Sequence, residues 1–168
     1  MGAQLRVYRR RIKSVQSTKK ITRAMELIAA SRIVKAQAAV KAAQPYARQI
    51  TRVISALASQ STIDHPLLQE QSQARRAAVL VVTSDRGLAG GYNANALKAA
   101  ASLEGLLRGE GKEPVAYLVG RKAAGFYRFR SRAVEQAWSG FSEQPSYADA
   151  KEVSDVLIGA FLRSPEDG

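Results

Sequence analysis

Residues 77–93 read AAVLVVTSDRGLAGGYN and give the clearest indication of the fold. Its first part, Ala77 to Thr83, is a continuous apolar and β-branched run, which is typical of a strand buried on both faces. A glycine-rich turn follows from Ser84 to Gly91, and an apolar helix pattern starts at about Asn93. Strand, turn and helix in this order predict the first unit of an α/β fold.

The residues that follow repeat this alternation. Expected strands lie at Val115–Val119 and Ala133–Trp138, and expected helices at 93–107, Arg121–Arg128 and Tyr147–Arg163. The order β-α-β-α-β-α predicts a Rossmann-like domain over residues 75–163, with a small parallel sheet and right-handed crossovers. Residues 164–168, SPEDG, are typical of the start of a flexible acidic loop.

Upstream of this domain, residues 1–60 predict one long helix. Gln4 to Ser59 contain no glycine and one proline, Pro45, and good helix formers dominate. The polar residues 61–74, which include the single histidine, His65, predict a linker. Along the helix, apolar residues recur at three- and four-residue steps, as in a coiled-coil seam. The expected seam consists of Leu5, Tyr8, Ile12, Val15, Ile21, Met25, Ile28, Val40, Ala43, Ala47, Ile50, Ile54 and Leu57.

A projecting helix of this length needs a mate, because helix stability in proteins comes mainly from burial of an apolar face. The longest other helix expected in this chain, Tyr147–Arg163, is far shorter. The mate is therefore a segment beyond this sequence or another chain. The step from Val15 to Ile21 breaks the heptad, so we expect a local change of winding there.

The net charge of +12 belongs to the same helix. Residues 1–60 hold 13 Lys and Arg against a single acid, Glu26, whereas the rest of the chain is balanced. Clustered positive charge favours an acidic surface, phosphates or anionic lipid. A plain solvated helix face is the alternative, but such a face usually interleaves Glu with Lys. The charge therefore indicates a partner.

Several classes of site find no support in the residues. The chain has no cysteine, and one histidine builds neither a metal site nor a charge-relay pair. The spacing Gly87-x-x-Gly90-Gly91 matches neither the dinucleotide fingerprint nor the P-loop. No apolar run is long enough to span a bilayer, and no secretory signal is visible. We expect a non-catalytic chain with no metal and no cofactor.

Two motifs resemble the gamma subunit of the F-type ATP synthase. Residues 11–32, RIKSVQSTKKITRAMELIAASR, resemble the N-terminal helix of that family, and residues 83–93, TSDRGLAGGYN, resemble its second hallmark. In the family, a C-terminal helix closes an antiparallel coiled coil with the N-terminal helix. That segment is absent from this sequence, and it would supply the missing mate.

The resemblance implies a central-stalk rotor that transmits torque between a proton-driven membrane ring and a catalytic head. It implies the alpha and beta subunits, the epsilon subunit and the membrane c-subunit ring as partners. It also implies a peripheral protein on the cytoplasmic side of a bacterial cell membrane. The residues implied to meet the acidic loop of the catalytic subunits are Lys20, Arg23, Met25 and Glu26 in the helix, and Asp85, Arg86, Gly87, Ala89, Gly90 and Gly91 in the turn.

Two other functions stay open on the residues alone. A basic helical arm could bind nucleic acid through phosphate neutralisation, with affinity that falls steeply with salt. Against this, residues 1–60 hold only two aromatic residues, Tyr8 and Tyr46, and the seam requires a helical mate. A nucleotide-using enzyme is the third hypothesis, and it rests on the weak glycine motif alone.

Overall fold

The computed structural model describes residues 2–60 and 74–162. The expected acidic loop at 164–168, and the expected linker apart from its last residue, lie outside the described residues. The chain forms two compact units, residues 1–63 and residues 64–168.

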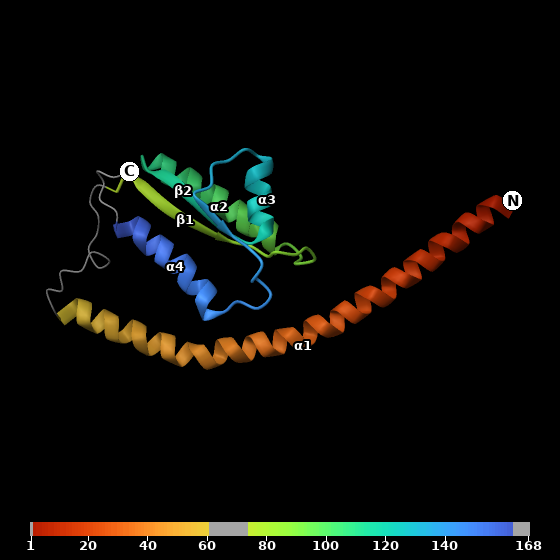
Figure 1. The fold of residues 1–168 in the computed structure, drawn as a ribbon, viewed down its shortest axis with the longest axis horizontal. Coiled ribbons are helices and arrows are strands. Elements are labelled where there is room, and N and C mark those ends of the chain that lie inside the picture. Colours follow the sequence, from red (N-terminus) through yellow and green to blue (C-terminus); the bar gives the residue numbers. More distant parts are fainter. Residues whose placement is uncertain (1, 61–73, 163–168) are drawn as a thin grey trace. The chain divides into compact units, whose positions relative to one another are not determined.

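The first unit is a single helix, α1 (Gly2–Gln60), which runs without a break through Pro45. It curves gently along its length (Figure 1). Good helix formers dominate its sequence, which explains the length of the helix. All side chains from residue 4 to residue 59 are exposed, those of the seam included. Among the described residues of this unit, therefore, nothing covers the apolar seam of α1.

This exposure predicts the behaviour of α1 in the isolated 168-residue chain. Without a packed apolar face we expect α1 to fray or to self-associate, because isolated helices are only marginally stable. In hydrogen exchange, amides of α1 should exchange quickly in a dilute monomer, while those of the central strand of the sheet stay protected. Uniform slow exchange from Leu5 to Leu57 in a monomer would contradict this expectation.

The second unit is built on a three-stranded parallel sheet in the order β1-β2-β3. Its strands are β1 (Arg76–Val82), β2 (Glu113–Val119) and β3 (Gln136–Trp138). The helices α2 (Tyr92–Gly109), α3 (Arg121–Phe129) and α4 (Tyr147–Leu162) alternate with the strands. The α/β fold class with a Rossmann-like alternation is thus confirmed, although β3 is shorter than the expected strand at Ala133–Trp138.

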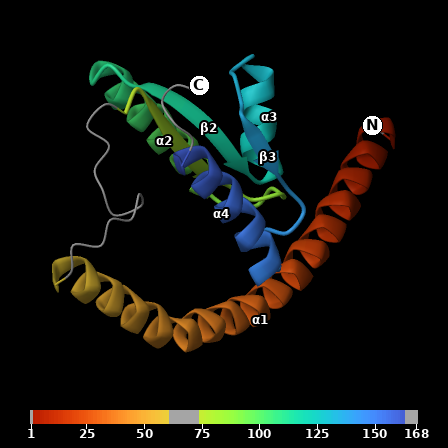
Figure 2. The same cartoon turned by 60° about the vertical axis from the view of Figure 1, so that its left-hand side comes forward.

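Helices cover both faces of this sheet (Figures 1 and 2). Successive residues of β2 point to opposite faces, as the pleat requires. On one face α2 and α3 pack over the sheet, and the buried residues there are Val79, Val81, Ala100, Ala116, Leu118, Ala123 and Tyr127. On the other face α4 packs over β2 and β3, and the buried residues are Tyr117, Val119, Trp138 and Val153.

The expectation that the first strand is buried on both faces is wrong. Val79 and Val81 are buried, but Leu80 is 41% and Val82 47% exposed. The reason is that the core beneath α4 contains residues of β2 and β3 and none of β1. β1 is an edge strand, and among the described residues of the α/β unit only one of its faces is covered.

A buried carboxylate ties α2 to α3. Glu104 is 4% exposed, and the hydroxyl of the buried Tyr127 donates to its Oε1 at 2.5 Å. The guanidinium groups of Arg132 and Arg108 lie 3.1 and 3.5 Å from its Oε2. Burial, followed by the hydrogen bond to Glu104, raises the pKa of Tyr127 to about 12. The network compensates its buried charge with two cations and a hydroxyl, so removal of one member leaves the others unsatisfied.

Candidate functional site

The turn after β1 begins at a close contact with the start of α3. Thr83 is 2% exposed, and its hydroxyl donates to the carbonyl of Val119 at 3.0 Å and accepts from the amide of Ala123 at 2.9 Å. Gly120 lies against it with φ +98, and a Cβ there would be 2.2 Å from the carbonyl oxygen of Thr83. Only glycine fits this position, both for its backbone conformation and for its space.

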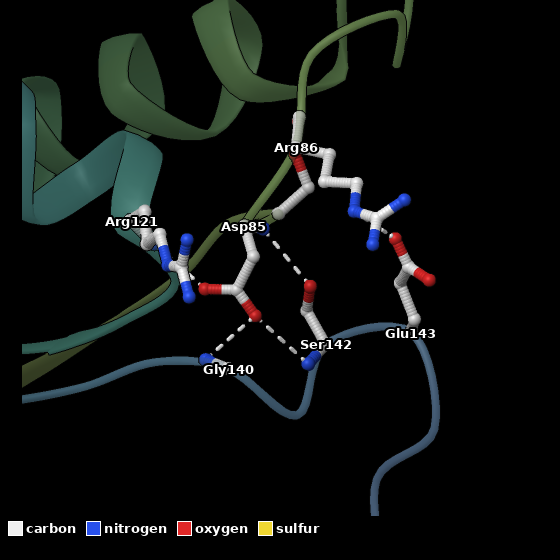
Figure 3. Close-up of polar contacts among 7 residues, drawn as sticks. Asp85, Arg86, Arg121, Gly140, Ser142 and Glu143 are labelled. Carbon is white, nitrogen blue, oxygen red and sulfur yellow. Dashed lines mark hydrogen bonds and ion pairs between the residues drawn. The ribbon is translucent and has the colours of Figure 1, made fainter.

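The carboxylate of Asp85 joins three segments of the domain (Figure 3). Its Oδ1 accepts from the amide of Arg121 at 3.0 Å, at the start of α3. Its Oδ2 accepts from the amides of Gly140 at 2.8 Å and Ser142 at 3.0 Å, which lie beyond β3. The hydroxyl of Ser142 in turn accepts from the amide of Asp85 at 2.9 Å. Asp85 thus fixes the base of the turn against two distant segments.

Together with two neighbouring hydrogen bonds, these bonds also satisfy the first backbone amides of α3. Phosphate-binding turns direct free amides of a helix N-terminus at the ligand. In this domain the amide of Arg121 donates to Asp85, that of Lys122 to the carbonyl of Ser84, and that of Ala123 to the hydroxyl of Thr83. The first amides of α3 therefore bind groups of the protein itself, and the negative charge at this helix end is the Asp85 carboxylate.

The loss of folding stability at low pH should depend on the carboxyl group of Asp85. Burial alone would raise its pKa, but the hydrogen bonds from Ser142, Arg121 and Gly140 hold the pKa of this carboxyl below its usual value. A lowered folded pKa stabilises the protein above the unfolded pKa of about 3.9, and that stability is lost as the pH falls.

We therefore expect Asp85→Asn to cost about 1–3 kcal/mol at neutral pH and to flatten the loss of stability below about pH 5. Urea unfolding followed by the fluorescence of Trp138, the single tryptophan, measures this. Asp155→Asn, which removes an exposed carboxylate paired with Lys151, is the matched control. Parallel pH curves for wild type and Asp85→Asn would refute the assignment.

The other side chains of the turn face outward or support its shape. The Arg86 Nε lies 2.6 Å from the Glu143 Oε1 (Figure 3). Asn93 holds the far end of the turn, because its Oδ1 accepts from the amide of Ser84 at 3.0 Å. Gly90 has φ +55 and Gly91 caps α2. Of the remaining residues, Gly87 is exposed and Ala89 is half-buried.

The turn also presents one large apolar side chain. Leu88 is 88% exposed and has φ +60, a conformation that residues other than glycine, asparagine and aspartate rarely adopt. The sequence prediction covers the turn Asp85–Gly91 but gives Leu88 no role of its own, although an apolar residue inside a polar, glycine-rich turn was an available signal. It also misses Ser142 and Glu143, because no local pattern indicates a contact with residues 57 positions away.

The second group of predicted contact residues lies on α1. Lys20, Arg23, Met25 and Glu26 are all exposed. Arg23 donates to Glu26 at 2.6 Å across one turn, so the single acid of residues 1–60 is paired on its own helix. Lys20 has no ion pair with any residue that the structure describes. The uncompensated charge of α1 is thus entirely positive.

The two groups of predicted contact residues belong to different units of the chain. Within the α/β unit the structure brings Asp85, Arg86, Ser142 and Glu143 together. Within residues 2–60 and 74–162, no group of three or more acidic or histidine side chains is arranged to hold a metal ion. Nor does a helix in those ranges have the length and hydropathy to cross a membrane.

Comparison with known proteins identifies the family of this chain. A family model described as ATP synthase matches residues 4–167, nearly the whole chain. The chain belongs to the ATP synthase family. Its relatives include the ATP synthase gamma chains of Frankia casuarinae, at 66% identity, Acidothermus cellulolyticus, at 61%, and Thermobifida fusca, at 58%.

Each of these three matches covers all 168 residues of this chain and 55–56% of the gamma chain concerned. The chain thus spans a little over half the length of these curated relatives and corresponds to the N-terminal portion of an ATP synthase gamma chain. The resemblance drawn from residues 11–32 and 83–93 is confirmed.

Proposed function

We propose that this chain is the N-terminal portion of the central-stalk rotor of a proton-translocating ATP synthase. In this role it transmits torque between the membrane ring and the catalytic head and performs no chemistry itself. The observation that carries the proposal is α1, a 59-residue helix with an uncovered apolar seam and one acid among its charges, in a chain of the ATP synthase family.

The apolar seam of α1 is the surface on which its partner helix, the mate, packs. In the proposed protein the mate is a second helix from the C-terminal part of the same chain, which closes an antiparallel coiled coil with α1. Burial of the seam would supply the stability that α1 lacks on its own. A stiff two-helix rod, in contrast to a single helix, can carry torsion along its length.

The charge of α1 suits a contact that has to move. Attraction between a basic surface and acidic loops acts over several ångströms and is not tied to one rotational position. We assign Lys20, Arg23, Met25 and Glu26, together with the turn Asp85–Gly91, to the contact with the acidic loops of the catalytic subunits. Asp85 itself holds the turn in shape through its internal hydrogen bonds.

The proposed partners follow from the same role. The catalytic head contributes the alpha and beta subunits, and the α/β unit stands with the epsilon subunit on the c-subunit ring. The protein would then be peripheral, held at the cytoplasmic side of a bacterial cell membrane through these subunits and not through a span of its own.

Assembly tests the proposal. The gamma chain, completed with the C-terminal part found in its relatives, should co-purify with alpha and beta subunits from the same source. In the assembled complex, ATP hydrolysis by the alpha and beta subunits should require a gamma chain with an intact seam. Ile50→Asp combined with Ile54→Asp places two charges in the seam and should abolish assembly, whereas Arg48→Gln combined with Arg52→Gln, on the same stretch, should retain it. Failure of the wild-type chain to co-purify would refute the proposal.

Nucleic-acid binding remains the alternative that the basic charge suggests. The exposed aromatics needed to stack bases are sparse on α1, and the comparisons give this alternative no support. A titration with duplex DNA at increasing salt decides the matter: binding that persists at physiological salt would favour the alternative.

A further inference from the structure

Leu88 combines two unfavourable features at one position. Its side chain is 88% exposed, and its backbone has φ +60. A single exposed leucine is ordinary on a protein surface, and so is a turn residue with positive φ when it is glycine. A leucine in this conformation has its Cβ close to the neighbouring carbonyl and gains no burial in return. Within the described residues of the α/β unit, the leucine side chain therefore gains little stabilising burial at this position.

The turn holds this leucine in place. Asp85 fixes one side through the amides of Arg121, Gly140 and Ser142, and Asn93 fixes the other through the amide of Ser84. Tyr92 adds a hydrogen bond from its hydroxyl to the carbonyl of Val82 at 2.9 Å. A projecting apolar side chain on a braced turn loses little conformational freedom on binding, which favours its use as an anchor.

Three cations and two carboxylates lie on or beside the turn that bears Leu88. Arg86 and Arg121 lie on either side of Asp85 (Figure 3), and the ammonium of Lys122 lies 3.8 Å from the position of a Cβ at Gly87. Glu143 is paired with Arg86, and Asp85 accepts from uncharged backbone amides, so Arg121 and Lys122 against Asp85 leave a net charge of +1. A surface that meets this turn is therefore best matched by an apolar socket with a carboxylate rim.

We propose that Leu88 is the anchor residue of the turn and inserts into an apolar socket, edged by carboxylates, on the catalytic head. This inference rests on the proposed function and adds to it the residue that carries the binding energy. Lys122 faces the acidic rim of the socket. Asp85 acts as a positioning residue that keeps Leu88 projecting.

The test uses the full-length gamma chain with isolated alpha and beta subunits of the same source. Leu88→Gly and Leu88→Asn remove the side chain and suit a positive φ, so they should leave the folded domain as stable as wild type or more so. Loss of a buried leucine should weaken binding to the head by roughly ten- to a hundredfold, mostly through faster dissociation. Phe129→Ser is the matched control, because Phe129 is also 88% exposed but lies at the end of α3.

Two readouts separate the possible results. The dissociation rate of the gamma chain from the head reports on the anchor, and the unfolding midpoint followed at Trp138 reports on the domain. Faster dissociation with an unchanged or raised midpoint, for both Leu88 variants and not for Phe129→Ser, is the expected result.

Each other result overturns the inference. Wild-type dissociation rates in both Leu88 variants would remove the anchor while leaving the proposed rotor intact. A lowered midpoint that accounts for the lost binding would make Leu88 a structural residue. If the variants bind the head normally but lose the epsilon subunit, the socket lies on the wrong partner. If the wild-type full-length chain does not bind the head, both the inference and the proposed function fail.

Discussion

Gly120→Ala is expected to unfold or severely destabilise the α/β unit, at a cost of about 4 kcal/mol or more. Two causes act at once. The backbone at Gly120 has φ +98, which strains any residue with a Cβ, and the added methyl would lie 2.2 Å from the carbonyl oxygen of Thr83. The obstacle is backbone, so no side-chain rotation relieves it.

The displacement of the backbone at Gly120 should also disturb the turn after β1, because Gly120 directly precedes Arg121, whose amide donates to Asp85. A shifted α3 would also break the bonds from Lys122 to Ser84 and from Ala123 to Thr83. Urea unfolding of the soluble variant, or its loss from the soluble fraction, measures the effect.

Gly125→Ala in the same helix is the control. Apart from its chain neighbours and the backbone of its own helix, no heavy atom lies within 4 Å of a Cβ at Gly125, and its backbone is helical. Alanine is the better helix former, so this variant should gain about 0.5–1 kcal/mol. Equal stability of the two variants would mean that the contact between Gly120 and Thr83 does not exist as described.

Glu104→Gln is the second substitution with a large expected effect, a loss of about 2–3 kcal/mol. Glutamine keeps the size of the side chain and one acceptor oxygen, but it removes the charge that faces Arg108 and Arg132. The side chain of Glu104 is 5% exposed, so water cannot replace the lost interaction. Glu110→Gln, which breaks the exposed pair with Lys112, should change stability by less than about 0.5 kcal/mol.

Tyr127→Phe tests the hydroxyl of the same network and should cost about 1–2 kcal/mol. The double variant should cost less than the sum of the two single losses, since the two side chains share one hydrogen bond. Strict additivity would show that the two residues do not interact.

The stability lost in Tyr127→Phe should depend on pH. In the folded protein the pKa of Tyr127 is raised to about 12, against an ordinary value of 10.0. Between these values the unfolded chain loses its proton first, so the tyrosine stabilises the fold below about pH 10 and stops doing so as the pH rises towards 12. The stability gap between wild type and Tyr127→Phe should therefore shrink over this range. A constant gap would contradict the raised pKa.

Most of the fold could be predicted because its signals are local. The absence of glycine from Gln4 to Ser59 indicates one helix, and α1 has nearly those bounds. The glycines at 109 and 111 correctly mark the end of α2, where Gly111 has φ +77. The apolar run at Ala77–Thr83 correctly indicates a strand. It misleads on burial, because β-branched composition reports strand preference and not the number of layers that cover a strand.

The site was predicted less completely, for a physical reason. The motif around Asp85 is visible in the sequence, but the partners of its carboxylate, Arg121, Gly140 and Ser142, come from two distant segments that only the folded chain brings together. The buried pair of Glu104 and Tyr127 was invisible for the same reason, since a single glutamate on an apolar helix carries no sign of its partner. Leu88 was visible as an apolar residue in a polar turn, but its positive φ and its exposure appear only in the folded chain.

The most direct test of the proposed rotor is to watch it turn. The full-length gamma chain is assembled into a head that is fixed to a surface, and a probe is attached to an exposed position of the α/β unit. On addition of ATP, the account predicts sustained rotation of the probe in one direction, at a rate that follows ATP hydrolysis. Hydrolysis of ATP by the assembled head while the probe only fluctuates about a fixed position would contradict it.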